Sequence, residues 1–417
     1  MRRFLSVPAA VAAFLTADCR AALPMIEVRA SDGDLDGAAM EVTWPNSTGL
    51  AAASTLSLAP LDAADLAVPA QILPGTPARL AWRLERPLKK GESRRYAIRL
   101  LPNPAEATMK CAESESAIEL REAGRLILRY WKKPSPEAAE NEPHYSRTGY
   151  IHPFLTPKGQ SVTGDYPTDH PHQHGLFFAW TNTEFAGHKL NFWDQKAETG
   201  RVLHDSTVET LEGNVVAGFT VRLRHEDLVL ADKPTTVLDE TWTVRAWRAV
   251  EGEGTLVDIE SRQVCASDRP LQILKYHYGG MAIRGPAAWF NPVKDAEPPA
   301  AFFTSEGKSR TDGNHTRPDW VAMTGPADEG GSATVAIFSH PENFRAPQWV
   351  RLHPAKPYFV FTPMVEEGFA IEPDRESPYV SRYRYLVFDG KPDPATLNRV
   401  WLGYSKPPAV SLVFEQP

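Results

Sequence analysis

The histidines of this chain are concentrated in one short segment. Five of the 12 histidines lie between residues 144 and 174, and His170, His172 and His174 occupy alternate positions. In an extended chain, alternate side chains leave from the same face, roughly 6–7 Å apart at their Cα atoms. That spacing lets two imidazoles bind one metal ion, or act as acid and base on one substrate. A hydrogen-bonded histidine cluster that only braces a loop is the third interpretation.

Two carboxylates flank these histidines. Asp165 and Asp169 could each accept the second N–H of an imidazole and so fix its orientation. We therefore predict an acid/base site with Asp169, His170 and His172 as catalytic residues.

A divalent metal is the alternative use of the same segment, with His170, His172 and His174 as its ligands. The sequence has neither a His-Glu-x-x-His nor a Cys-x-x-Cys motif, although Asp194 or Glu184 could supply a carboxylate ligand. The sequence therefore specifies no cofactor, and a divalent metal stays an alternative.

A second cluster of functional side chains is Lys275-Tyr276-His277-Tyr278, which follows an apolar run and precedes two glycines. If this segment is a strand, Lys275 and His277 share one face and the two tyrosines share the other. We predict Lys275 and His277 as catalytic and Tyr276 as substrate-binding. The alternative is that the tyrosines belong to the core and Lys275 is solvated.

Further candidates are scattered along the chain. His152 is predicted to be catalytic and Arg147 to hold an anionic substituent, since both lie shortly before the first histidine cluster. His340 follows a predicted buried strand, where binding residues are common. Trp180 and Trp193 offer flat faces on which sugar rings could stack, although such aromatic residues more often fill a core.

Alternation of apolar and polar residues predicts an all-β fold, with a large antiparallel β-sandwich. The chain has 37 prolines in 417 residues, roughly 9% against an average of about 5%. Proline is excluded from helix interiors and central strands, so this content favours many turns and edges. The clearest predicted strands are Met25–Arg29, Leu80–Leu84, Tyr96–Leu100, Leu126–Trp131, Phe219–Arg224, Glu240–Arg245, Leu256–Glu260 and Ala333–Phe338.

One helix is predicted near the end of the chain. Asp393 is a suitable N-cap and Pro394 fits the first helical position. The apolar residues that follow recur at helical spacing and form one stripe: Leu397, Val400, Trp401 and Tyr404.

The chain is expected to divide into three parts. Residues 1–22 resemble a signal peptide, with Arg2 and Arg3 before an apolar stretch and cleavage after Ala21 or Ala22. The protein is therefore expected to be exported, to the periplasm or outside the cell. Residues 23–104 predict a small N-terminal β-sandwich domain, and residues 105–417 the large sandwich that carries the site.

Composition excludes several classes of partner. The net charge is −7 and no basic stripe occurs, so nucleic acid is not expected as a partner. No apolar run reaches 18 residues, so no membrane span is expected. There is no Gly-x-Ser-x-Gly motif, no phosphate loop and no dinucleotide fingerprint. Cys111 and Cys265 could pair in an exported protein or be two separate buried thiols.

Four motifs together resemble the family DUF6807, which is also labelled "methane oxygenase PmoA". They are Tyr150-Ile151-His152-Pro153, Asp169-His170-Pro171-His172-Gln173-His174-Gly175-Leu176, Tyr278-Gly279-Gly280 and Phe338-Ser339-His340-Pro341. The likeness extends from about residue 110 to 417. A subunit of particulate methane monooxygenase is a membrane protein, so that label does not describe this chain.

The resemblance implies a large β-sandwich similar to the galactose mutarotase supersandwiches, in an exported bacterial protein of a glycan-degrading organism. The positions that match the motifs of the family best are His152, His170, His172 and His340. Many members have arginine at the position of His174 and histidine at that of Gln173, so the resemblance supports His174 least.

We therefore expect an exported carbohydrate-active enzyme, a hydrolase, lyase or epimerase, that uses histidine acid/base chemistry on a carbohydrate or small-molecule substrate. One alternative is a non-catalytic glycan-binding protein. The other is a metal-dependent oxygenase or hydrolase.

Overall fold

The computed structural model describes residues 23–45, 55–101, 106–250, 252–293 and 296–414. The predicted signal peptide lies outside these residues. The described chain is almost entirely β-structure in antiparallel sheets, which confirms the predicted fold class. Each of the eight strands named above lies inside a strand of the structure or extends past its end by one residue.

The N-terminal part forms one seven-stranded sheet, here called the small sheet, in the order β2-β5-β4-β3-β6-β1-β27. Its end strands β2 and β27 approach each other, so the sheet curls around its own core of Ile26, Val28, Leu58 and Trp82. Its strands are β1 (Met25–Arg29), β2 (Ala39–Trp44), β3 (Leu56–Pro60), β4 (Val68–Leu73), β5 (Ala78–Arg83), β6 (Ser93–Leu100) and β27 (Ala409–Val413).

Strand β27 comes from the far end of the chain and pairs with β1, Met25 opposite Val413. The division expected at residues 104 and 105 therefore leaves out one strand of the small sheet. Sequence reading could not place it, because a five-residue run carries no information on which distant strand it joins.

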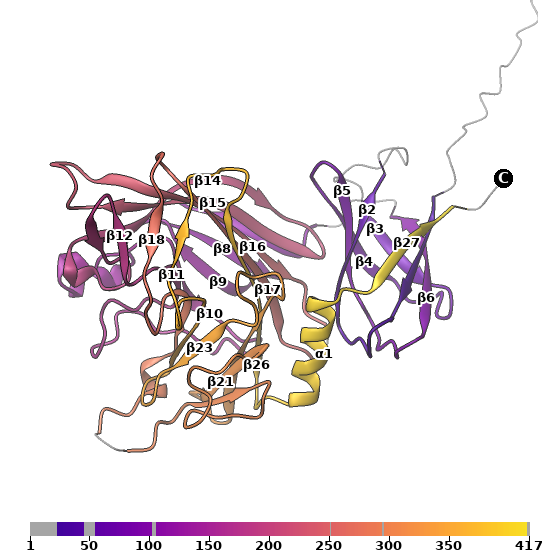
Figure 1. The fold of residues 1–417 in the computed structure, drawn as a ribbon. Helices are drawn as coiled ribbons and strands as arrows, with labels where there is room; N and C mark the ends of the chain where they lie inside the picture. Colours follow the sequence, from indigo (N-terminus) through magenta and orange to yellow (C-terminus); the bar gives the residue numbers. More distant parts are fainter. Residues whose placement is uncertain (1–22, 46–54, 102–105, 251, 294–295, 415–417) are drawn as a thin grey trace, which may run out of the picture.

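Two eight-stranded sheets form the large sandwich (Figure 1). The front sheet has the order β23-β24-β19-β11-β10-β9-β8-β7. Its strands are β7 (Met109–Glu113), β8 (Ala117–Glu122), β9 (Arg125–Trp131), β10 (Tyr150–Phe154), β11 (Leu176–Ala179), β19 (Gly280–Arg284), β23 (Trp349–Leu352) and β24 (Tyr358–Thr362).

The back sheet has the order β14-β15-β16-β17-β26-β22-β21-β20. Its strands are β14 (Gly200–Leu211), β15 (Val216–Asp227), β16 (Thr235–Trp247), β17 (Thr255–Cys265), β20 (Ala301–Thr304), β21 (Trp320–Pro326), β22 (Ser332–Ser339) and β26 (Tyr379–Asp389). A four-stranded sheet lies beside the sandwich: β13 (His188–Leu190), β12 (Thr183–Phe185), β18 (Leu271–Ile273) and β25 (Phe369–Ile371). Within the described residues, four short 3-10 helices occur in the connections: η2 (Pro136–Glu140), η3 (Pro143–Tyr145), η4 (Gln195–Ala197) and η5 (Ala287–Trp289).

The two faces of the front sheet have different neighbours. Residues directly paired across antiparallel strands project to the same face. On the inner face, Phe359 contacts Phe302 of the back sheet, and Phe361 stacks on Tyr383 at 5.9 Å between ring centroids. The pairing register puts the following side chains on the opposite, outer face: Phe177, Arg284, Arg351 and Tyr358.

The predicted helix is α1 (Pro394–Ser405), and it lies between the small sheet and the sandwich (Figure 1). The Asp393 side chain accepts hydrogen bonds from the N–H groups of Ala395 and Thr396, as expected of an N-cap. The predicted apolar stripe packs against a cluster that includes Leu73 of the small sheet and Trp320 of the back sheet. The helix therefore joins the two parts through its apolar face.

Two other expectations can be compared with the described residues. Cys111 and Cys265 are both buried free thiols. No helix in the described part of the chain is long and apolar enough to cross a membrane.

The side chain of Gln71, on β4, joins the small sheet to the back sheet. Its Oε1 accepts from the N–H groups of Val215 (3.0 Å) and Val216 (2.9 Å). Its Nε2 donates to the carbonyls of Glu212 and Val216, both at 3.2 Å. One buried amide thus satisfies both its donor and its acceptor capacity across the interface.

We predict that Gln71→Leu lowers the free energy of unfolding by roughly 1–3 kcal/mol, because buried backbone groups lose their partners. Urea denaturation measures this change. The matched control is Gln272→Leu on β18, where the half-buried side chain makes no hydrogen bond within the described residues. An equal, small change in both variants would contradict the role assigned to Gln71.

Candidate functional site

The segment that carries the central histidines folds as two consecutive turns. The N–H of His170 donates to the carbonyl of Pro167 (3.0 Å), and that of Gln173 to the carbonyl of His170 (2.9 Å). Pro171 occupies the second position of the later turn, which proline favours. The expectation of an extended segment with three histidines on one face is therefore wrong. A bridge between Asp165 and His174 closes the loop at its base.

His174 points into the protein interior and braces this loop. Its side chain is fully buried, and its Nδ1 lies 2.9 Å from Oδ1 of Asp165. Asp165 also accepts from the hydroxyls of Tyr150 (2.7 Å) and Ser135 (3.2 Å). Burial opposes the charge of Asp165, but hydrogen bonds led by that from His174 outweigh it and hold its pKa below the ordinary value.

His152 belongs to the same buried region rather than to the exposed histidines. Its Nδ1 lies 3.0 Å from Oγ1 of Thr163, and burial lowers its pKa. Within the described residues, no hydrogen bond or ring contact joins His152 to His170 or His172.

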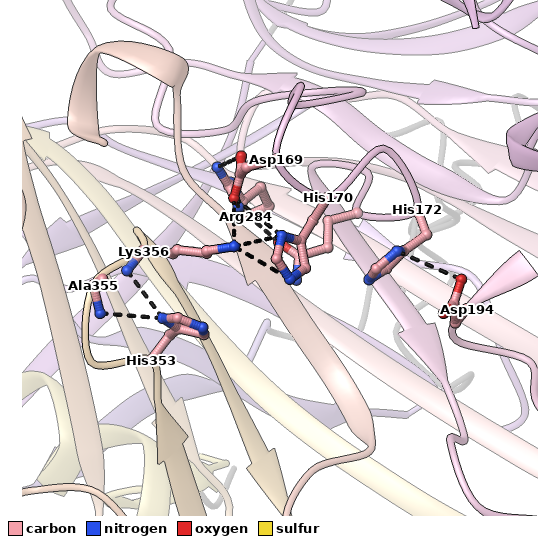
Figure 2. Close-up of polar contacts among 9 residues, drawn as sticks. Asp169, His170, His172, Asp194, Arg284, His353, Ala355 and Lys356 are labelled. Carbon is pink, nitrogen blue, oxygen red and sulfur yellow. Dashed lines mark hydrogen bonds and ion pairs between the residues drawn. The ribbon is translucent and has the colours of Figure 1, made fainter. Parts of the chain in front are cut away.

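Asp169 is the centre of a charged network on the outer face of the front sheet (Figure 2). Its carboxylate accepts two hydrogen bonds from Arg284 of β19, at 2.7 and 3.2 Å, and lies 3.0 Å from Nζ of Lys356. Arg284 also donates to Oε1 of Gln173 at 3.0 Å. Burial raises the pKa of Asp169, but hydrogen bonds from His170, Arg284 and Lys356 together bring it far below its ordinary value.

Lys356 holds His170 as well as Asp169. Its Nζ lies 2.6 Å from Nδ1 of His170, which in turn is 3.1 Å from Oδ2 of Asp169. An ammonium group only donates, so this close approach requires a lone pair on Nδ1. In that state His170 accepts from Lys356, whereas with a proton on Nδ1 it instead donates to Oδ2 of Asp169.

His172 lies beside His170, with 5.2 Å between ring centroids. Its Nδ1 is 3.6 Å from a carboxylate oxygen of Asp194, and its side chain is 15% exposed. Burial is the main cause that lowers the pKa of His172 to about 4, and the positive charge of Lys356 adds to it, although Asp194 opposes the shift. His172 is therefore a neutral imidazole at neutral pH.

His353, in the hairpin between β23 and β24, is also neutral. Its Nδ1 accepts from the N–H groups of Ala355 and Lys356, each at 3.1 Å (Figure 2). Its proton must then be on Nε2. Burial, aided by the charge of Arg351, lowers its pKa to about 3.

Ring contacts connect these histidines to the second cluster that the sequence indicated. His170 contacts His353 at 6.4 Å, His353 contacts Tyr358 at 5.8 Å, and Tyr358 contacts Tyr278 at 6.4 Å between ring centroids. Tyr278 then contacts His277 at 4.6 Å. The two clusters therefore form one continuous group of side chains.

The second cluster is not a strand, contrary to expectation. Strand β18 ends at Ile273, and residues 274–279 are irregular because they lead into two glycines with positive φ, Gly279 and Gly280. The rings of Tyr276, His277 and Tyr278 contact one another in sequence and are half-buried. The predicted separation into two faces is therefore wrong. Lys275 is exposed, as in the solvated alternative.

Three predicted substrate-binding residues have structural partners instead. The Arg147 guanidinium is buried and donates to the carbonyls of Phe178 and Phe192, so it cannot hold a substrate anion. Burial lowers its pKa to about 10. Trp180 is fully buried in the core, and its Nε1 donates to Gln263. His340 packs on Tyr404 of α1, at 5.0 Å between ring centroids, away from the other histidines.

Trp193 is buried too, but it lies directly beneath the site. Its ring contacts Tyr278 at 4.9 Å and Tyr358 at 5.8 Å. It supports those rings rather than offering an open face of its own.

Sequence reasoning missed Arg284, His353 and Lys356. Arg284 was detectable as a single charged residue at the end of an apolar stretch, where its burial requires a partner. His353 and Lys356 lie more than 170 residues beyond His172 in the sequence, and nothing local indicates their proximity.

The histidines predicted as metal ligands do not form one ligand set. The structure brings His170 and His172 together, whereas His174 is engaged by Asp165 in the interior. In the part of the chain that the structure describes, no group of three or more His, Cys, Asp or Glu side chains is arranged to hold a metal ion. A cavity of about 770 Å³ does exist elsewhere, between the small sheet, α1 and the back sheet, and no predicted site residue lines it.

We predict that Asp169→Asn lowers the free energy of unfolding by about 3 kcal/mol, since Arg284, whose side chain is 1% exposed, loses its balancing charge. The control is Asp205→Asn, which breaks a solvent-exposed pair with Arg224 and should cost less than about 1 kcal/mol. Equal losses in the two variants, measured by urea denaturation, would contradict this assignment.

A pH dependence follows from the neutral His353. Between its folded pKa of about 3 and the ordinary value of 6.5, the unfolded chain binds more protons than the folded one. The free energy of unfolding must therefore fall as the pH falls through this window. We expect His353→Asn, whose side-chain oxygen can accept the same backbone N–H groups, to lose less stability than the wild type between about pH 7 and about pH 5. The control for the substitution itself is His188→Asn, on β13 outside the site.

The chain matches one protein family and is distantly similar to several solved structures. No curated protein is significantly similar in sequence. The chain is similar to an α-mannosidase from Enterococcus faecalis V583, at 11% identity and a TM-score of 0.40, over 94% of this chain and 46% of that one. It is also similar to a galactose mutarotase related enzyme from Lactobacillus acidophilus, at 9% identity and a TM-score of 0.27, over 68% of this chain and 100% of that one. The chain thus spans less than half the length of the mannosidase.

The model of a family of unknown function, DUF6807, matches residues 117–402. This range contains the front and back sheets almost completely, together with the turns and hairpin that carry Asp169, His172 and Lys356. Because the match covers well over half of the sequence, the chain belongs to the DUF6807 family.

Proposed function

We propose that the protein is a carbohydrate-active enzyme that moves protons with His172, His170 and Lys356. One observation carries the proposal: a neutral imidazole, His172, lies 5.2 Å from an imidazole that a lysine holds by hydrogen bonding. A neutral imidazole that can take up a proton, close to a donor such as the ammonium of Lys356, is what acid/base catalysis requires.

His172 acts as the base. Its Nδ1 faces the carboxylate of Asp194, which favours the tautomer with the proton on Nδ1 and leaves the lone pair on Nε2. Burial keeps this ring neutral down to a pH of about 4. Its Nε2 can therefore accept a proton from a sugar carbon, a hydroxyl or water.

His170 and Lys356 act as the acid. Nε2–H of His170 donates to the departing or developing oxygen, while Nδ1 takes up a proton from Lys356, 2.6 Å away. Asp169 keeps Lys356 in position through its 3.0 Å contact, and Arg284 keeps Asp169 ionised. The arrangement serves hydrolysis, β-elimination and epimerisation alike, because each needs one proton removed and one supplied.

The sugar is proposed to bind across Tyr276, His277 and Tyr278. These rings are half-buried, connect through Tyr358 to the histidines, and alternate apolar faces with polar edges. Such surfaces suit a pyranose, which has apolar C–H faces and polar hydroxyls at its rim. Residues 1–22 are proposed to direct export, to where polysaccharides are met.

The test is turnover of an oligosaccharide panel by the wild type, His172→Asn and the control His188→Asn. We expect His172→Asn to reduce kcat by about 10²- to 10⁴-fold, with substrate binding retained, and the control to match the wild type. Product analysis and binding are measured in parallel. Unchanged turnover by His172→Asn would refute the mechanism, and sugar binding without any product would favour a non-catalytic glycan-binding protein.

A further inference from the structure

Arg351 stands out among the arginines of the front sheet because it has no counter-charge. The other arginines in the strands of that sheet each contact a carboxylate: Arg121 and Arg129 contact Glu119, Arg125 contacts Glu122, and Arg284 contacts Asp169. Among the described residues, no hydrogen bond or ion pair reaches the guanidinium of Arg351, and its Nε is buried without a partner. Arg351 is half-buried, and an anion that paired with its guanidinium would supply the missing counter-charge.

Tyr358, on the same outer face, has a second unpaired group. Its side chain is 3% exposed, and its hydroxyl is buried without a hydrogen-bond partner. Burial raises its pKa well above the ordinary value, so the hydroxyl keeps its proton and can donate. The hydroxyl is thus a donor without a partner among the described residues, and it could donate to a group that the protein itself does not supply.

Further donors surround these two residues. The positive charge of Arg351 contributes to the low pKa values of His277, His315 and His353, after burial itself. His353 presents its Nε2–H, because backbone N–H groups occupy its Nδ1. Asp194, the nearby carboxylate that influences Tyr278, is engaged by His172 and by the N–H of Lys196. The region around Arg351 is thus rich in donors and positive charge.

We propose that Arg351 and Tyr358 bind an oxyanion substituent of the substrate, so that the enzyme acts on an acidic sugar. This inference rests on the proposed function and names its substrate class. The fork of a guanidinium matches two oxygens of one planar or tetrahedral anion. A uronic acid carboxylate and a sugar sulfate ester share this chemistry, and the experiment distinguishes them.

A series of ring contacts connects the proposed anion site to the acid/base residues. Tyr358 contacts His353, and His353 contacts His170. A sugar whose anionic group lies on Arg351 therefore has its ring beside the histidines. Neutralising a carboxylate also makes the hydrogen on the adjacent carbon easier to remove, which assists a base such as His172.

The test compares the binding of glucuronic acid, galacturonic acid, galactose 6-sulfate, glucose and galactose by isothermal titration. The proteins are the wild type, Arg351→Gln, Arg351→Lys, Tyr358→Phe and the control Arg375→Gln, whose side chain is 72% exposed and only 3.9 Å from Asp239. Thermal unfolding establishes that each variant is folded.

We expect the wild type to prefer acidic over neutral sugars. Arg351→Gln should weaken acidic-sugar binding by about 10- to 100-fold, the loss of a charge-assisted pair of hydrogen bonds, without affecting neutral sugars. Arg351→Lys should weaken it less, because the charge remains. Tyr358→Phe should weaken it by several-fold, and Arg375→Gln should not change it. Preference for the carboxylates or for the sulfate identifies the anion.

Equal affinity for acidic and neutral sugars, or an unchanged affinity in Arg351→Gln, would overturn the inference. The proposed function would survive that result if turnover still depended on His172. Absence of binding by every sugar to the wild type would overturn both.

Discussion

The ion pair between Asp169 and Arg284 is the interaction on which the candidate site depends. Arg284 lies on a strand of the front sheet with its side chain 1% exposed, and Asp169 lies in a turn that has no regular structure of its own. A charge so deeply withdrawn from water needs a counter-charge at close range. The pair therefore fixes the turn to the sheet, and the same carboxylate then positions Lys356.

The ion pair between Asp169 and Arg284 also determines where the other site residues lie. Lys356 fixes His170, whose ring lies against His172, and His353 closes the group from the hairpin between β23 and β24. On the other side of the loop, Asp165 and His174 form a separate buried pair. The loop is thus held at its base by the contact between His174 and Asp165, and at its tip by that between His170 and Asp169. The imidazoles of His170 and His172 remain partly exposed.

Sequence periodicity was sufficient for the fold because the strands carry their burial pattern locally. Phe219–Arg224 and Glu240–Arg245 alternate cleanly, and the helix that begins after Asp393 has both a cap and an apolar stripe. The histidine segment was found as well, since clustered residue types need no structure to be noticed. The conformation of this segment was not predicted correctly, because the alternation of histidines suggests a strand, whereas Pro167 and Pro171 favour turns.

The partners of the site could not be read from the sequence. Arg284, His353 and Lys356 meet Asp169 and His170 only through the pairing of strands that are far apart in the chain. Arg147 and Trp180 illustrate the converse, because a cation or an indole near a promising motif can be engaged by backbone carbonyls or by the core. Residue type indicates the chemistry available, whereas exposure decides whether it is used.

The pairing of β27 with β1 also constrains the order in which the molecule can be assembled. Strand β1 begins at Met25 and β27 ends at Val413, so one edge of β1 has no partner until the ribosome has reached the residues of β27. During synthesis that edge presents free N–H and C=O groups to any other extended segment nearby. The small sheet can therefore become complete only after the strands of the large sandwich, β7 to β26, have been synthesised.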